Sequence, residues 1–159
     1  MQIWSVPAVH SNGINAAFVS GELGKEMKAN GLTAYVGPPG GYVLRFSNGL
    51  TAYLSGDTGI TAEQQKVVRD HYQAKLAVIN IGDTFTTGPK EAAHVVNELV
   101  KPAAVIASHA NEAATKNGKV IPGTRTETFI KATRVPVHLP LSGRTMHFDA
   151  RGRCVKGCE

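Results

Sequence analysis

Apolar positions along this chain follow two spacings, and their alternation predicts strands that alternate with helices. Residues 76–81 and 103–107 are short continuous apolar runs, which are typical of strands covered on both faces. Between them, Pro89 suits the first turn of a helix that runs to about residue 100, where Lys101-Pro102 ends it. This order of elements predicts an α/β fold.

A β-hairpin is predicted ahead of these elements. Within residues 41–54, apolar segments flank the pair Asn48-Gly49, which favours the positive φ angles of a tight turn. A helix is expected from Thr61, because Gln64 falls three residues later as in a capping box. The other expected elements are strands over 3–9, 135–139 and 145–148, a helix over 126–132, and a short helix or a loop over 22–30.

Composition bounds the class of protein. The 159 residues, 42% of them hydrophobic, suffice for one packed core. No apolar run approaches the roughly 20 residues of a membrane helix, and the first residues lack the basic and apolar regions of a signal peptide. We therefore expect a single cytoplasmic domain over residues 1–159 without membrane contact, ending in a flexible tail over residues 149–159.

Positive charge is concentrated towards the end of the chain. Residues 1–115 hold 8 basic and 9 acidic side chains, whereas residues 116–159 hold 9 basic and 3 acidic ones. Such a segment attracts anions, phosphorylated substrates or nucleic acid, or it forms an ordinary solvated face. The basic residues are scattered and lack interleaved aromatic residues, so nucleic acid is not expected as a partner.

The two cysteines, Cys154 and Cys158, lie in the glycine-containing tail and do not form a CxxC pair. Two thiols cannot complete a zinc site alone. We expect free thiols, with a disulfide within the tail as the alternative.

Three candidate metal ligands follow predicted strands, where open α/β sheets carry their sites. His10 follows the opening strand, Asp57 follows the hairpin, and His109 follows the apolar run at 103–107. Two imidazoles and one carboxylate fit zinc, with manganese and iron as alternative divalent ions. Taken singly, the aspartate also fits a turn or helix-cap acceptor, and each histidine fits an ordinary surface residue.

Four segments carry a resemblance to a known family. In order along the chain they are Val6-Pro7-Ala8-Val9-His10-Ser11, Tyr53-Leu54-Ser55-Gly56-Asp57-Thr58-Gly59, Ile81-Gly82-Asp83-Thr84-Phe85-Thr86-Thr87-Gly88-Pro89-Lys90-Glu91-Ala92-Ala93 and Val105-Ile106-Ala107-Ser108-His109-Ala110-Asn111. Together they resemble the C-terminal portion of the metallo-β-lactamase superfamily. The most similar branch is the metal-dependent hydrolases that resemble ascorbate-6-phosphate lactonase.

This resemblance implies an αββα sandwich with two divalent metals between its sheets. On the matching positions, His10 completes the ligand set of the first metal, Asp57 bridges both metals, and His109 is the last ligand of the second. A water shared between two such cations is acidified and attacks a carbonyl or phosphoryl centre. The implied activity is hydrolysis of a small-molecule lactone, ester or phosphoester.

One family motif, His-x-His-x-Asp-His, is absent from this sequence. The resemblance therefore implies a partial domain that holds the second half of a metal site, with incomplete activity. The alternative is a truncated, catalytically inactive domain that self-associates and at most binds metal or anions. Half of a sandwich leaves an apolar sheet face uncovered, so a homo-oligomer is expected.

Two further segments each have two interpretations. The helix start at Thr86-Thr87-Gly88-Pro89 offers free amides to an anion, or is simply capped. Arg125 fits a fork onto a carboxylate or phosphate, or an ordinary surface arginine near a helix start.

Overall fold

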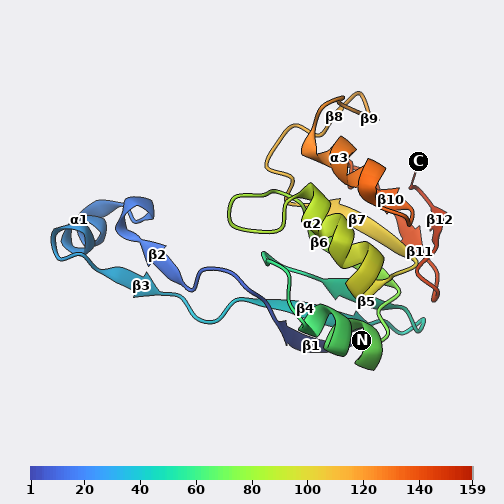
Figure 1. The fold of residues 1–159 in the computed structure, drawn as a ribbon, viewed down its shortest axis with the longest axis horizontal. Coiled ribbons are helices and arrows are strands. Elements are labelled where there is room, and N and C mark those ends of the chain that lie inside the picture. The colour runs from blue at the N-terminus through green and yellow to red at the C-terminus, as the bar shows by residue number, and fades with distance from the viewer. Residues whose placement is uncertain (159) are drawn as a thin grey trace.

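A six-stranded mixed sheet forms the centre of the molecule in a computed structural model that describes residues 1–158 (Figure 1). The strand order is β1-β4-β5-β6-β7-β10. The first three strands pair antiparallel, and β5, β6, β7 and β10 pair parallel. Their bounds are β1 Gln2–Pro7, β4 Gly40–Arg45, β5 Thr51–Leu54, β6 Leu76–Asn80, β7 Ala104–Ser108 and β10 Val137–His138.

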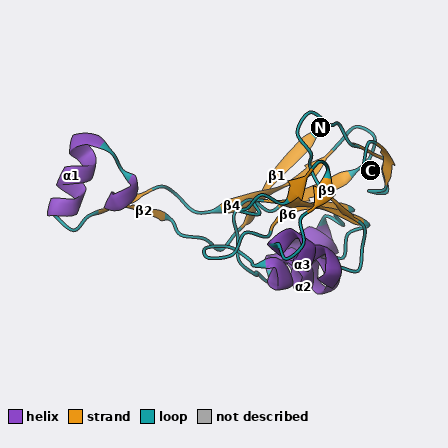
Figure 2. Ribbon diagram, turned by 90° about the horizontal axis from the view of Figure 1, so that it is seen from above, coloured by secondary structure: helices purple, strands orange, loops and turns teal. Residues whose placement is uncertain are grey.

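Helices cover one face of this sheet, as Figure 2 shows for α2 and α3. The parallel strands require crossover connections, and these connections carry the helices. The core between the two layers contains the fully buried side chains of Tyr53, Ile79 and Phe129. The helical segments are η2 Gln64–His71, α2 Pro89–His94, its continuation η3 Val95–Val100, and α3 Arg125–Ala132. The α/β fold expected from the sequence is confirmed.

Helix ends follow the sequence signals. Pro89 occupies the first turn of α2, and the Glu91 carboxylate accepts a hydrogen bond from the Gly88 amide at 3.0 Å. Lys101 ends the following helix in the left-handed region, at φ 50°. Ahead of η2, the Gln64 side chain accepts a bond from the Thr61 amide at 3.0 Å, which is one half of the predicted capping box.

The predicted hairpin is present as β4 and β5, but its turn is longer than a two-residue turn. The Phe46 amide donates to the Leu50 carbonyl at 2.8 Å, and the Asn48 side chain accepts from the Leu50 amide at 3.0 Å. Gly49 alone takes a positive φ, of 88°. Asn48 therefore acts through its side-chain oxygen rather than through a left-handed backbone.

The C-terminal residues cover part of the other sheet face. Strands β11 (His147–Phe148) and β12 (Cys154–Lys156) form an antiparallel pair, and Phe148 packs against a buried cluster on the sheet. This cluster consists of Leu50, Ala52, Leu76 and Ala104. Residues 149–158 therefore differ from the flexible tail that the sequence predicted. The Asp149 carboxylate accepts backbone bonds within this turn, and hydrophobic contact holds the hairpin on the sheet.

Cys154 and Cys158 form a disulfide in this hairpin, so the alternative of a tail disulfide holds in place of two free thiols. The chain turns between them at Gly157, whose φ is 77°, and this turn brings the two side chains together. Glu159, the last residue of the predicted tail, lies outside the described residues.

Residues 12–36 form an arm that projects from the body (Figures 1 and 2). The Val36 amide donates to the Asn12 carbonyl at 2.9 Å and closes its base. Helix α1 resolves the open choice between helix and loop over residues 22–30 in favour of a helix. The arm elements are β2 Gly13–Asn15, η1 Ala16–Phe18, α1 Gly21–Ala29 and β3 Thr33–Tyr35.

One more small hairpin, formed by β8 (Thr115–Lys116) and β9 (Lys119–Val120), lies just before α3 in the chain. Among residues 1–158, no helix has the length and apolar character needed to cross a membrane.

Candidate metal centre

Asp57 lies in the turn that leaves β5. Gly56, just before it, has φ 59°, and a Cβ there would lie 2.6 Å from the Gly40 carbonyl oxygen. Only glycine fits this close approach without strain. After the turn, the Gly59 amide donates to the Val9 carbonyl at 2.8 Å, which ties the segment that contains His10 beside the Asp57 turn.

A buried asparagine holds this turn in place. Asn80 ends β6 and is 1% exposed. Its Oδ1 accepts from the Thr58 amide at 3.3 Å, and its Nδ2 donates to the Thr58 carbonyl at 3.1 Å and to Thr87 Oγ1 at 2.8 Å. The Ser55 hydroxyl lies 3.1 Å from Asn80 Oδ1. One side chain thus joins the Asp57 turn to β6 and to the loop before α2.

His109 follows β7 at the same edge of the sheet, with a left-handed backbone at φ 47°. Its carbonyl oxygen lies so close to Gly82 that a Cβ at position 82 would collide with it. Non-glycine residues with positive φ gather at this edge, namely Asp83, Thr84, His109 and Asn111. Such conformations cost about 1–3 kcal/mol each and cluster at functional sites.

The structure brings Asp57 and His109 together. His109 Nε2 lies 3.6 Å from Asp57 Oδ2, and the two side chains are 43% and 47% exposed. An imidazole nitrogen and a carboxylate oxygen at this separation are donors that zinc and similar divalent ions accept. Their partial exposure leaves the pair accessible to an ion or to a small molecule.

His10 is placed differently. Its Nδ1 lies 3.3 Å from the Ser11 carbonyl oxygen and 3.2 Å from the Ser11 hydroxyl, at the surface. Residues 1–158 contain no group of three or more His, Cys, Asp and Glu side chains that could hold a metal ion. The Asp57–His109 pair fits a divalent metal by donor type but not by number, and the ligand set of His10, Asp57 and His109 stays a prediction.

Both helix starts that the sequence singled out are capped within the chain. The Gly88 amide at the start of α2 is occupied by Glu91, so capping explains that segment. At the start of α3, the Thr124 hydroxyl accepts from the Glu127 amide at 3.1 Å, and Glu112 accepts from the Thr126 amide at 3.0 Å.

The sequence analysis did not predict a role at this site for two residues, Asn80 and Gly82. The available signal was a polar residue that ends an otherwise apolar run, in Leu76-Ala77-Val78-Ile79-Asn80. A polar side chain at that position has to find partners because both sheet faces are covered there.

Sequence relatives are metal-dependent hydrolases by name. A "UPF0173 metal-dependent hydrolase" of Roseiflexus sp. is 36% identical over 97 residues, which are 61% of this chain and 39% of the relative. One of the same name from Polynucleobacter asymbioticus is 32% identical over 142 residues, covering 80% of this chain and 50% of that protein. The chain spans half or less of the length of these relatives. No protein-family model matches it.

Solved structures share the fold. Igni18, a metallo hydrolase from Ignicoccus hospitalis, superimposes with a TM-score of 0.55 at 22% identity over 96% of this chain and 51% of its own. An isothiocyanate hydrolase from Delia radicum gut bacteria gives 0.57 at 18% identity, over 93% and 54%. The solved structures show the fold, and together with the sequence relatives they support the resemblance to the metallo-β-lactamase superfamily that the four sequence motifs carry.

Proposed function

We propose that this chain carries part of the centre of a metal-dependent hydrolase. The observation that carries the proposal is the Asp57–His109 pair, whose facing atoms are 3.6 Å apart at the edge where three loops meet. The names of the sequence relatives support the same activity class. We propose zinc as the ion, because an imidazole and a carboxylate are common zinc donors.

The roles of the residues follow from their positions. Asp57 and His109 would hold the ion directly, and His10 would add a third donor from the adjoining segment. A bound divalent ion acidifies a water and polarises a carbonyl or phosphoryl oxygen. Asn80 fixes the backbone beside Asp57, and Gly82 admits the His109 backbone, so both act as positioning residues.

The proposed substrate is a small molecule with a lactone, ester or phosphoester bond. Hydrolysis of each of these bonds proceeds by attack of water at an electron-poor carbon or phosphorus, which is the chemistry that a divalent ion assists. A four-coordinate ion needs more donors than one aspartate and one histidine supply. Full activity therefore depends on further donors beyond this pair.

A second candidate function is that of a catalytically inactive domain. The observation that favours it is that no group of three metal-ligating side chains forms within residues 1–158. Such a domain would self-associate and at most bind metal or anions, without turnover.

Zinc titration by calorimetry, followed by turnover measurements, separates the two candidates. The proposal expects about one Zn²⁺ per chain at micromolar affinity or tighter. The changes Asp57→Ala and His109→Ala should each weaken binding at least about tenfold, or about 1.4 kcal/mol. His94→Ala, an exposed histidine at the end of α2, is the matched control and should bind as the wild type does.

Turnover is then measured with chromogenic ester, lactone and phosphoester substrates on the zinc-loaded chain. Metal-dependent hydrolysis that Asp57→Ala abolishes supports the hydrolase. Absence of zinc binding at micromolar free ion, or binding that neither change affects, contradicts it. Stoichiometric binding without turnover favours the inactive domain.

A further inference from the structure

The arm formed by residues 12–36 exposes apolar side chains that nothing in its own chain covers. Phe18 is 80% exposed and Tyr35 is 72% exposed. Three aliphatic side chains on the same arm, those of Leu23, Leu32 and Val36, are each more than half exposed. Both views show the arm directed away from the body, so the sheet and helices of its own chain do not shield it (Figures 1 and 2).

This arm has little internal packing to maintain its shape. Its only well-buried side chain is that of Met27, at 5% exposure, beside Gly24 in helix α1. A two-stranded hairpin is marginal in water by itself, and a nine-residue helix is too short to be stable alone. An arm of this kind gains a fixed structure when another surface covers it.

A second uncovered apolar surface lies at the root of the arm. The pairs Ile3–Leu44 and Ser5–Tyr42 bring the outward side chains of β1 and β4 onto one face, with Pro7 opposite Gly40. We call this the open face. Ile3 and Tyr42 are 56% and 52% exposed, and the C-terminal hairpin does not extend over them.

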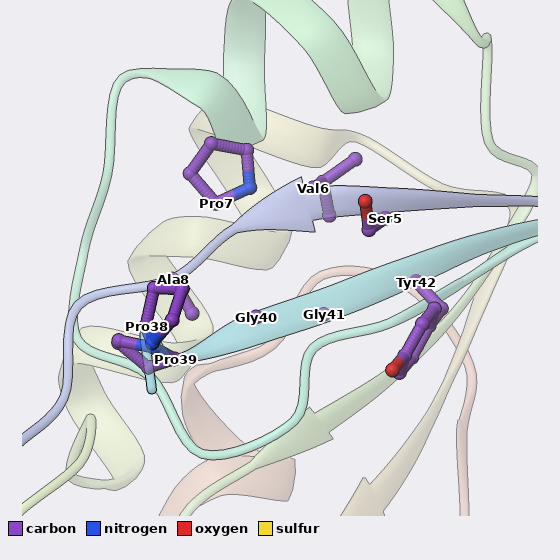
Figure 3. Close-up of a pocket in the computed structure, with 9 residues that line it drawn as sticks. All are labelled: Ser5, Val6, Pro7, Ala8, Pro38, Pro39, Gly40, Gly41 and Tyr42. Carbon is purple, nitrogen blue, oxygen red and sulfur yellow. The ribbon is translucent and has the colours of Figure 1, made fainter. Parts of the chain in front are cut away.

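The open face borders a hollow of about 580 Å³ that no charged side chain lines. In Figure 3, Tyr42 points to the side of the sheet opposite Val6, away from the helical layer. Arg45, the cation of β4, lies on the other face of the sheet. Its guanidinium is 5.6 Å from the centre of the Trp4 ring. The residues that line the hollow are Ser5, Val6, Pro7, Ala8, Pro38, Pro39, Gly40, Gly41 and Tyr42.

Charge favours a second copy of this chain as the occupant. The arm carries two acidic and two basic side chains and is neutral, although the whole chain has a formal charge of +5. Glu22 and Lys25 pair with each other at 2.6 Å. Two neutral apolar surfaces can meet without repulsion, whereas a strongly acidic or basic partner would find no counter-charge on either surface.

We propose that the arm is a dimerisation element that lies over the open face of a second copy of the chain. The exchange is reciprocal, so that each copy's arm covers the open face of the other. A two-fold axis satisfies both surfaces of both copies at once and closes the assembly. The two exposed aromatic side chains alone offer about 300 Å². Together with the aliphatic residues and the open face, each copy offers an area on the order of the roughly 800 Å² that one partner contributes to a standard interface.

Sedimentation equilibrium of the full chain tests the assembly. The wild type should form a dimer of twice the 16.8 kDa chain mass. Phe18→Asp and Leu23→Asp should each raise the dimer dissociation constant at least about tenfold. Val155→Asp is the matched control, because Val155 is 63% exposed and Leu23 is 64% exposed, and it should leave the dimer unchanged.

Disulfide trapping tests the exchange itself. Chains with Phe18→Cys are mixed with chains with Tyr42→Cys and oxidised, and the expected product is a link between the two kinds of chain. Linkage confined to pairs of Phe18→Cys chains overturns the exchange. A wild type that stays monomeric at high micromolar concentration overturns the dimer, as does equal weakening by Val155→Asp.

A variant in which a Gly-Gly link replaces residues 13–35 guards against local misfolding of the arm. The Asn12–Val36 bond places the two ends side by side, so a short link can close the body. A monomer that still unfolds in one cooperative thermal transition supports the proposal. A persistent dimer of this variant overturns it.

Discussion

Replacing Asn80 by alanine tests the physical basis of the candidate site. The side chain is 1% exposed and forms hydrogen bonds to both backbone atoms of Thr58 and to the Thr87 hydroxyl. The change leaves the Thr58 amide, the Thr58 carbonyl and the Thr87 hydroxyl without their bonds to the Asn80 side chain. A buried group deprived of its partner costs about 1–3 kcal/mol, so the expected loss in free energy of unfolding is about 3 kcal/mol.

Asn97 offers a matched comparison within the same chain. Its Nδ2 donates to the Ala132 carbonyl at 2.9 Å, and its Oδ1 accepts from the Arg134 amide at 2.9 Å. Asn97 is partly exposed, so water can replace the lost bonds. We expect Asn97→Ala to cost about 1 kcal/mol or less.

Urea unfolding followed by circular dichroism measures both variants, since the slope m shows whether the exposed surface is unchanged. Zinc calorimetry on the same samples reports the Asp57 turn, which should loosen in Asn80→Ala alone. Equal destabilisation of the two variants would refute the reasoning, because burial would then make no difference to the loss of an amide.

Three further predictions concern packing and pH. Phe129→Ala should lower the free energy of unfolding by about 3–5 kcal/mol, because Phe129 is fully buried in the core, and a loss under 1 kcal/mol in urea would contradict this. Gly82→Ala should cost about 1–3 kcal/mol and weaken zinc binding, since its Cβ would displace the His109 carbonyl; Gly59→Ala, where a Cβ has no close neighbour, should do neither. Burial raises the pKa of the Tyr53 phenol above its ordinary value of about 10, so its contribution to stability is full below that value and falls as the pH rises above it. Urea unfolding across this range should show a shallower alkaline loss for Tyr53→Phe, and parallel curves would rule out the assignment.

Local patterns in the sequence predicted most of the central layer. The apolar runs at 76–81 and 103–107 correspond to β6 and β7, and Pro89 begins α2 as expected. These signals are local, because an apolar run and a helix cap each involve residues only a few positions apart. The arm was not predicted, since its strands of three residues each carry too few positions to show a period.

The site was predicted only in its residue types. Asp57 and His109 were identified by their position after strands, and the structure brings them to 3.6 Å. His10 was assigned by the same reasoning, but its orientation depends on a turn whose neighbours lie some fifty residues away, at Thr58 and Gly59. The Asn80 hydrogen bonds were not predicted, because bonds between loops that are distant in the chain produce no regular spacing of residues in the sequence.

The sequence by itself determined the α/β alternation, the family resemblance and the chemical types of the candidate ligands, because periodicity, turn residues and short motifs are encoded locally. The tertiary structure decided which candidate ligands meet, that Phe148 packs the C-terminal hairpin against the sheet, that a disulfide closes within this hairpin, and that residues 12–36 project as an uncovered arm. The physical reason is distance along the chain. Each of these features apart from the disulfide depends on packing between distant segments, which only the assembled sheet brings together.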